Sequence, residues 1–221
     1  QMAGQPLDWV KLREQWRILL SLGVPLMFAG LLTLVVQLIV RSWVTLELGM
    51  DSAGYFQAAW LISASYLGFV LSAMGTDYYP RLSGVIHDKS LATKLVNEQS
   101  EMLLLMTAPL LILTLTFAPW IIQLLYSEDF APAYEVLQWQ TLGDVVKIMT
   151  WPIGFIVLAR GQGALFVATQ LNWNIWYLII IWLGMPIVGL KALGIAYFVA
   201  YLTQLIVVYL AAKRILLFSA S

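Results

Sequence analysis

The chain has 221 residues, of which 61% are hydrophobic and only 11% are charged, and its net charge at pH 7 is +0. Soluble domains are about 45–50% apolar and about 25% charged, so this composition is typical of an integral membrane protein. The balanced charge gives no bulk attraction to nucleic acid, and the lack of cysteine excludes disulfides and thiolate metal sites.

The chain opens on Gln1 rather than methionine, and its first apolar run is too long for a signal peptide, so we expect an N-terminal part of a longer protein to be missing.

The first segment has the pattern of an amphipathic helix. Trp9, Leu12 and Trp16 fall at i, i+3 and i+7, and Asp8 is a candidate N-cap. Residues 8–17 are therefore predicted to form an entry helix that lies on the membrane surface.

Six apolar stretches follow, each long enough to cross the roughly 30 Å hydrocarbon core at about 1.5 Å per helical residue. All are predicted to be helices, because an open sheet cannot satisfy its backbone in lipid and the runs do not alternate as barrel strands do. The predicted fold class is an all-α integral membrane lobe of six transmembrane helices, without a second domain. The expected spans are about 18–40, 53–76, 102–126, 134–158, 164–187 and 193–212.

Basic residues are distributed unevenly between the connections. If every span crosses, most of them lie on one side, and the positive-inside rule places that side in the cytoplasm together with both termini. We expect residues 77–101 to form a long cytoplasmic loop with a short surface helix. The bases on the cytoplasmic side are Lys11, Arg13, Arg17, Arg81, Lys89, Lys94, Arg160, Lys213 and Arg214, and those on the other side are Arg41 and Lys191.

Two features could shape the helices. Proline removes a backbone donor and clashes with the preceding turn, so prolines inside spans either bend single helices or allow the bundle to rock between two shapes. Gly68, Ser72 and Thr76 recur every four residues, which predicts close packing of another helix. The candidate kinks lie at Pro25, Pro109, Pro119 and Pro152.

The fourth span carries a polar stripe of Gln140, Asp144, Lys147 and Trp151. At about 100° per residue these side chains share one helix face. A lone charge at mid-membrane costs about 2.5–3.5 kcal/mol on insertion scales, so the stripe should face other helices or a watery cavity. Either Asp144 and Lys147 form a structural ion pair, or the stripe is a cavity wall that binds a polar substrate. Asp144 is then the candidate ion-coupling carboxylate.

Aromatic residues are abundant, with ten tryptophans and ten tyrosines. Such residues are typical of the two membrane interfaces, but some could stack on sugar rings in a cavity. The candidate interfacial set is Trp9, Trp16, Tyr78, Tyr79, Trp120 and Tyr126, and the candidate stacking set is Trp139, Trp151, Trp173 and Trp176.

Catalytic and nucleotide-binding patterns are lacking. The single histidine, His87, lies in a charged segment and is expected to be solvated. The turn Gly161-Gln162-Gly163 lacks the lysine and the Ser/Thr of a phosphate loop. Neither a filter-like loop nor rings of charge indicate a channel. The sequence therefore favours a carrier that is not an enzyme and has no cofactor or metal site.

An ordered series of short motifs runs through the chain. It comprises TDYYPRLS at 76–83, VNEQ at 96–99 leading to Ala108-Pro109, LYS at 125–127, Phe130, LQWQ at 137–140, LGD at 142–144 and WPIGF at 151–155. In this order, over about residues 49 to 209, the series resembles the polysaccharide-transporter family of the MOP superfamily, the Wzx-type O-antigen flippases.

The resemblance implies a MATE-like transporter with two six-helix lobes around a cationic cavity, of which this chain is the second lobe. The missing N-terminal lobe is then a partner. Such proteins flip undecaprenyl-pyrophosphate-linked oligosaccharides across the bacterial inner membrane for O-antigen and lipopolysaccharide synthesis, driven by a proton or sodium gradient. Arg41, Lys147 and Arg160 are the implied cations for the pyrophosphate, with Gln140 and Trp151 as further substrate contacts.

Two alternatives stay open. A drug or cation antiporter of the same superfamily would use a more acidic cavity around Asp144, yet Lys147 lies one turn away. A non-transporting membrane scaffold, or a half-transporter that dimerises, would also explain a chain with a single lobe.

Overall fold

Six long helices make up almost all of the computed structural model, which describes residues 9–218, without the side chains of residues 9–15, 17–19, 21–22, 74 and 217–218. The predicted cap Asp8 lies outside the described residues. All six helices are long and apolar enough to cross a membrane, which confirms the predicted fold class. They are α1 (Trp9–Leu48), α2 (Met50–Val85), α3 (Lys89–Leu125), α4 (Ala133–Ala159), α5 (Gly163–Val188) and α6 (Lys191–Phe218), with a short 3-10 helix η1 (Glu128–Phe130) before α4.

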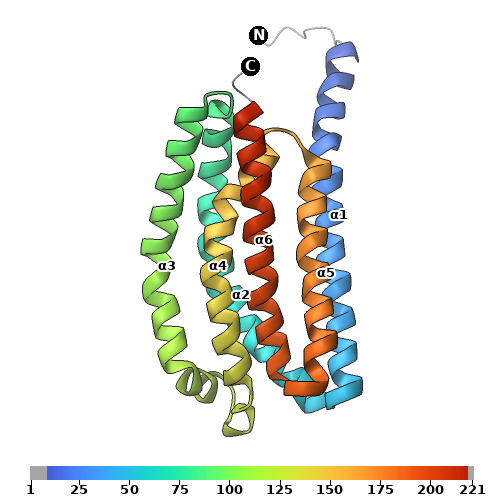
Figure 1. The fold of residues 1–221 in the computed structure, drawn as a ribbon, viewed down its shortest axis with the longest axis vertical. Helices are drawn as coiled ribbons and strands as arrows, with labels where there is room; N and C mark the ends of the chain where they lie inside the picture. Colours follow the sequence, from blue (N-terminus) through green and yellow to red (C-terminus); the bar gives the residue numbers. More distant parts are fainter. Residues whose placement is uncertain (1–8, 219–221) are drawn as a thin grey trace, which may run out of the picture.

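The helices run up and down in one bundle (Figure 1). The start of α1, the end of α6 and the α2–α3 and α4–α5 turns lie at one end, and the other connections lie at the opposite end. Helix α4 packs against α2, α3 and α6, while α5 packs against α1 and α6. Because α4 packs against these three helices, a buried site on α4 can include side chains from several neighbours.

The first helix is longer than the predicted span. Helix α1 continues without a break from Trp9 through Arg41 and Glu47, and the chain turns only at Gly49, whose φ is +88°. The predicted end at residue 40 is wrong because Val44 is fully buried and extends the packed face, while Arg41 and Glu47 lie on the exposed face. A charged residue on the exposed face of a helix does not require the helix to end there.

The expected loop over residues 77–101 is also wrong. Helix α2 runs on to Val85 and α3 begins at Lys89, so only three residues separate them. The Asp88 carboxylate accepts hydrogen bonds from the backbone N–H groups of Ser90 and Leu91, which makes it the N-cap of α3. The charged residues therefore extend two helices beyond the apolar core.

Tyr78 lies in the part of α2 that extends beyond the apolar core, and it was predicted to lie at the membrane interface. Tyr78 is fully buried, and its hydroxyl donates a 2.9 Å hydrogen bond to the carbonyl of Pro152 on α4. By contrast, Trp16, Trp120 and Tyr126 are exposed, as membrane-facing aromatics would be.

The closest helix packing occurs between α4 and α6. A Cβ built on Gly143 would lie 2.5 Å from Cδ1 of Tyr197 and 3.1 Å from the backbone Cα of Phe198. A Cβ on Gly194 would lie 2.8 Å from the backbone oxygen of Val136. The face predicted to pack closely is instead exposed: no described atom lies within 4 Å of a Cβ on Gly68.

We predict that Gly143→Ala destabilises the bundle by about 1–3 kcal/mol, because overpacking forces the two helices apart. Alanine is otherwise about 1 kcal/mol better than glycine in a helix. The matched control Gly68→Ala should leave stability unchanged or raise it. Thermal unfolding of the purified chain in detergent measures both, and an undiminished melting temperature for Gly143→Ala would contradict the α4–α6 contact.

Candidate functional site

Asp144 lies at the centre of a hydroxyl cluster that joins three helices. The carboxylate on α4 is fully buried. On α2, Ser63 Oγ and Tyr66 OH donate to Oδ2 at 2.6 and 2.8 Å, and on α6, Tyr197 OH donates to Oδ1 at 2.8 Å. Hydrogen bonds to a charged acceptor are about twice as strong as neutral ones, so these three hydroxyls stabilise a carboxylate that is shielded from bulk solvent.

Lys147 does not pair directly with Asp144. Its Nζ lies 3.4 Å from the Tyr197 hydroxyl, to which it can donate, and 5.8 Å from the ring centroid of Tyr201. In the described part of the chain the ion pairs are Arg81–Asp77 and Lys94–Glu98. The predicted pair is therefore replaced by a chain in which Lys147 donates to Tyr197 and Tyr197 donates to Asp144. The i, i+3 spacing permits a pair, but the tyrosine from α6 occupies the position between the two groups.

Lys147 and Trp151 line a cavity of about 490 Å³ inside the bundle. Side chains from α1, α2, α4, α5 and α6 form its wall. Polar groups from α5 and α6 lie among aromatic rings, and the Trp173 indole N–H is buried without a hydrogen-bond partner among the described residues. The polar and aromatic residues of the lining include Trp60, Tyr79, Lys147, Thr150, Trp151, Thr169, Gln170, Trp173, Tyr201 and Gln204.

The other predicted site residues lie elsewhere. Gln140 is fully buried, and neither of its amide atoms has a partner among the described residues, but it does not line the cavity. Arg41 is exposed on α1 and donates to Gln57 Oε1 on α2. Arg160 lies at the α4–α5 turn, where its Nη1 is 3.2 Å from Nδ1 of His87. The structure thus joins Asp144, Lys147 and Trp151 in one region and leaves Gln140, Arg41 and Arg160 outside the cavity.

The four tryptophans that could stack on sugar rings lie in three different environments. Trp151 and Trp173 line the cavity, Trp139 packs against Phe198, and Trp176 is exposed. His87 is exposed, as expected for a solvated residue, and it also contacts Arg160 across the two turns.

Sequence reasoning missed the contribution of α6. Tyr197, Tyr201 and Gln204 fall at i, i+4 and i+7, which places one polar face on an otherwise apolar span. Gln204 accepts a 3.2 Å hydrogen bond from the Asn172 amide of α5. The same periodicity that reveals the stripe on α4 could have revealed this second stripe, which faces it.

We predict that Tyr197→Phe destabilises the bundle by about 1–3 kcal/mol, because it removes one donor to a buried carboxylate and the acceptor for Lys147. The control is Tyr209→Phe, because Tyr209 is exposed on the same helix. Melting temperatures in detergent report the effect. Equal stability of the two variants would show that the hydroxyl cluster does not hold α6 to α4.

Comparisons with known proteins agree with this architecture. The chain is 23% identical over 143 residues to the lipid III flippase of Escherichia coli K12, which covers 62% of this chain and 33% of that protein, and the lipid III flippase of Shigella flexneri matches equally. The chain thus spans about a third of the length of these curated relatives. The crystal structure of a MATE point mutant matches with a TM-score of 0.85 at 14% identity, over 94% of this chain and 47% of that one.

The fold is therefore that of about half of a MATE transporter chain. A family model described as "Polysaccharide biosynthesis protein" matches residues 5–135, more than half of the chain. The chain is a multi-pass membrane protein that belongs to this polysaccharide biosynthesis family.

Proposed function

We propose that this chain is one lobe of a transporter that flips an oligosaccharide linked to undecaprenyl pyrophosphate across the bacterial inner membrane. The observation that carries the proposal is a single lysine at bilayer depth that faces a cavity lined by aromatic rings and amides. Lys147 is the only charged residue among the described residues that line this cavity.

The sign of this charge favours an anionic substrate. The nearest acid, Asp144, is enclosed by three hydroxyls and does not line the cavity, so a ligand in the cavity meets the ammonium group of Lys147 first. At a separation of a few ångströms this cation attracts a phosphate and repels a cationic drug. The arrangement supports the flippase over the drug or cation antiporter.

The remaining wall suits a sugar. Sugar rings present apolar C–H faces and polar hydroxyls, so they bind well between aromatic rings and amide groups. Trp151, Trp173 and Tyr201 offer rings, while Gln170 and Gln204 offer hydrogen bonds. A cavity of this composition can hold a charged phosphate next to Lys147 and a sugar beside it.

Asp144 is proposed as the ion-coupling group. Neutralising its carboxylate would weaken the hydrogen bond that the Tyr197 hydroxyl donates to it. Because the same hydroxyl accepts a hydrogen bond from Lys147, the protonation or ion-binding state of Asp144 would affect Lys147 in the cavity. Gln140, one turn before Asp144 on α4, is buried with an unpartnered amide. The proposed driver is a proton or sodium gradient.

Translocation in this proposal needs a second lobe, and Arg41 and Arg160 would meet the pyrophosphate outside the cavity at opposite ends of the bundle. Pro25, Pro109, Pro119 and Pro152 all lie inside helices and are proposed hinges for rocking between two shapes. The excess of basic residues at the end that holds the α2–α3 and α4–α5 turns supports a cytoplasmic location for that end and for both termini.

We predict that Lys147→Gln lowers the affinity of the purified chain for a short-chain prenyl pyrophosphate disaccharide by about 10- to 150-fold. This is the loss expected for one charge-assisted contact of about 1.5–3 kcal/mol. Titration calorimetry in detergent measures the affinity. The matched control is Lys191→Gln, which removes a lysine that does not line the cavity.

Unchanged affinity in Lys147→Gln would remove this cavity from the mechanism. Transport itself is tested in liposomes with the chain joined to an N-terminal six-helix lobe. Binding without any transport by the joined protein would instead support the scaffold.

A further inference from the structure

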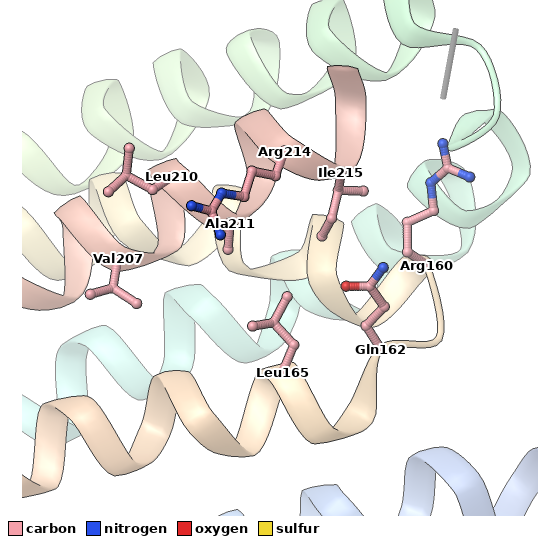
Figure 2. A pocket seen from close by; sticks show the side chains of 8 residues that line it. All are labelled: Arg160, Gln162, Leu165, Val207, Leu210, Ala211, Arg214 and Ile215. Carbon is pink, nitrogen blue, oxygen red and sulfur yellow. The ribbon is translucent and has the colours of Figure 1, made fainter. Parts of the chain in front are cut away.

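A second hollow lies at the end of the bundle that carries most of the basic residues, between the start of α5 and the end of α6. Its volume is about 570 Å³, and Figure 2 shows the side chains that line it. Five of its eight lining residues are aliphatic, and the polar ones come from the α4–α5 turn and from Arg214. This hollow, the α5–α6 groove, is separate from the cavity that contains Lys147.

The groove lies where the membrane interface is expected. Gln162 falls between the candidate span that ends at Ala159 and the one that begins at Gly163, and Arg214 is close to the end of the last span, Lys191–Leu216. The polar groups of the groove are therefore level with lipid headgroups, and its aliphatic part is level with the first carbons of the acyl chains.

Arg214 provides one free positive charge in this groove. Its side chain is exposed, and no hydrogen bond or ion pair within the described chain occupies its guanidinium. Three acids at this end already have partners within the described chain: Asp77 pairs with Arg81, Glu98 pairs with Lys94, and Asp88 caps α3. An arginine at this level that lacks a protein partner is well suited to a phosphate.

The second arginine of the lining, Arg160, is directed elsewhere, and its buried Nε and Nη2 have no hydrogen-bond partner among the described residues. Figure 2 shows the guanidinium of Arg160 turned away from Arg214 toward the α2–α3 turn, where it contacts His87. The groove thus presents one guanidinium with the Gln162 amide nearby, which matches a single negative charge better than a pyrophosphate.

The apolar part of the groove continues into the membrane. Ala211 and Ile215 form a buried floor, and Leu210, Ile206 and Leu202 are exposed at four-residue intervals along α6, leading away from Arg214. This ridge gives an acyl chain a continuous apolar surface. The described lining contains no aromatic ring on which a nucleotide base could stack.

We propose that the α5–α6 groove binds a singly charged anionic glycerophospholipid, with its phosphate at Arg214 and Gln162 and an acyl chain along the apolar ridge of α6. The occupant is a lipid of the surrounding bilayer rather than the transported glycolipid. The groove shares no lining residue with the Lys147 cavity. The proposed lipid contacts, Arg214 and Gln162, also exclude Arg160, which the proposed function assigns to the pyrophosphate.

The test uses the purified 221-residue chain in a mild neutral detergent. Native mass spectrometry and melting temperature are recorded with phosphatidylglycerol, with phosphatidylcholine of the same chains, and with inorganic phosphate. Phosphatidylglycerol should bind and stabilise the chain most. Arg214→Gln should weaken its binding by about tenfold, the loss of one charge-assisted contact. Lys213→Gln, which removes the neighbouring charge outside this groove, should leave binding unchanged.

Val207→Trp supplies a second variant that fills the groove without changing the charge, and it should also reduce binding. Equal binding of the two lipids, equal losses in Arg214→Gln and Lys213→Gln, or undiminished binding in Val207→Trp would each overturn the proposal. Stabilisation by inorganic phosphate alone to the same extent would identify a soluble-anion site and would overturn the lipid assignment as well.

Discussion

The structure depends on how a carboxylate is kept at bilayer depth. Asp144 is fully buried without a direct cationic partner among the described residues, so its charge is stabilised by three hydroxyl donors, two from α2 and one from α6. Because an unsatisfied charge in this position would cost several kcal/mol, these bonds fix the mutual positions of three helices. The glycine at 143 lets the Tyr197 ring lie directly against α4, which brings its hydroxyl to the carboxylate.

The same arrangement places the two charged groups of α4 in different surroundings. Since Tyr197 stands between the acid and the base, Lys147 is free to face the cavity while Asp144 stays in the helix interface. A direct ion pair would have neutralised both groups and left an uncharged cavity. One tyrosine hydroxyl thus separates the buried acid from the lysine that lines the cavity, and it links Asp144 to Lys147 through two hydrogen bonds.

Much of the fold follows from the sequence, because apolar run length is a direct consequence of bilayer thickness. The ends of the helices do not, since charged residues such as Arg41 or Glu98 can continue a helix into water. The stripe on α4 was visible from periodicity, yet the role of each member depended on α6: Asp144 and Lys147 are separated by a tyrosine that lies about fifty residues further along the chain. Such contacts depend on which helices are neighbours, and a single sequence does not give that.

The central claim is that the cavity beside Lys147 is wet and positively charged. Thr150 lines it, and the chain has no native cysteine, so Thr150→Cys offers one defined reporter. Its reaction rates with anionic and cationic methanethiosulfonates are each normalised to a free thiol. The anionic reagent should be faster by about five- to tenfold, as a charge a few ångströms away in a hydrated site predicts, and Lys147→Gln should abolish the difference. Faster reaction with the cationic reagent, or no reaction with either, would contradict the account.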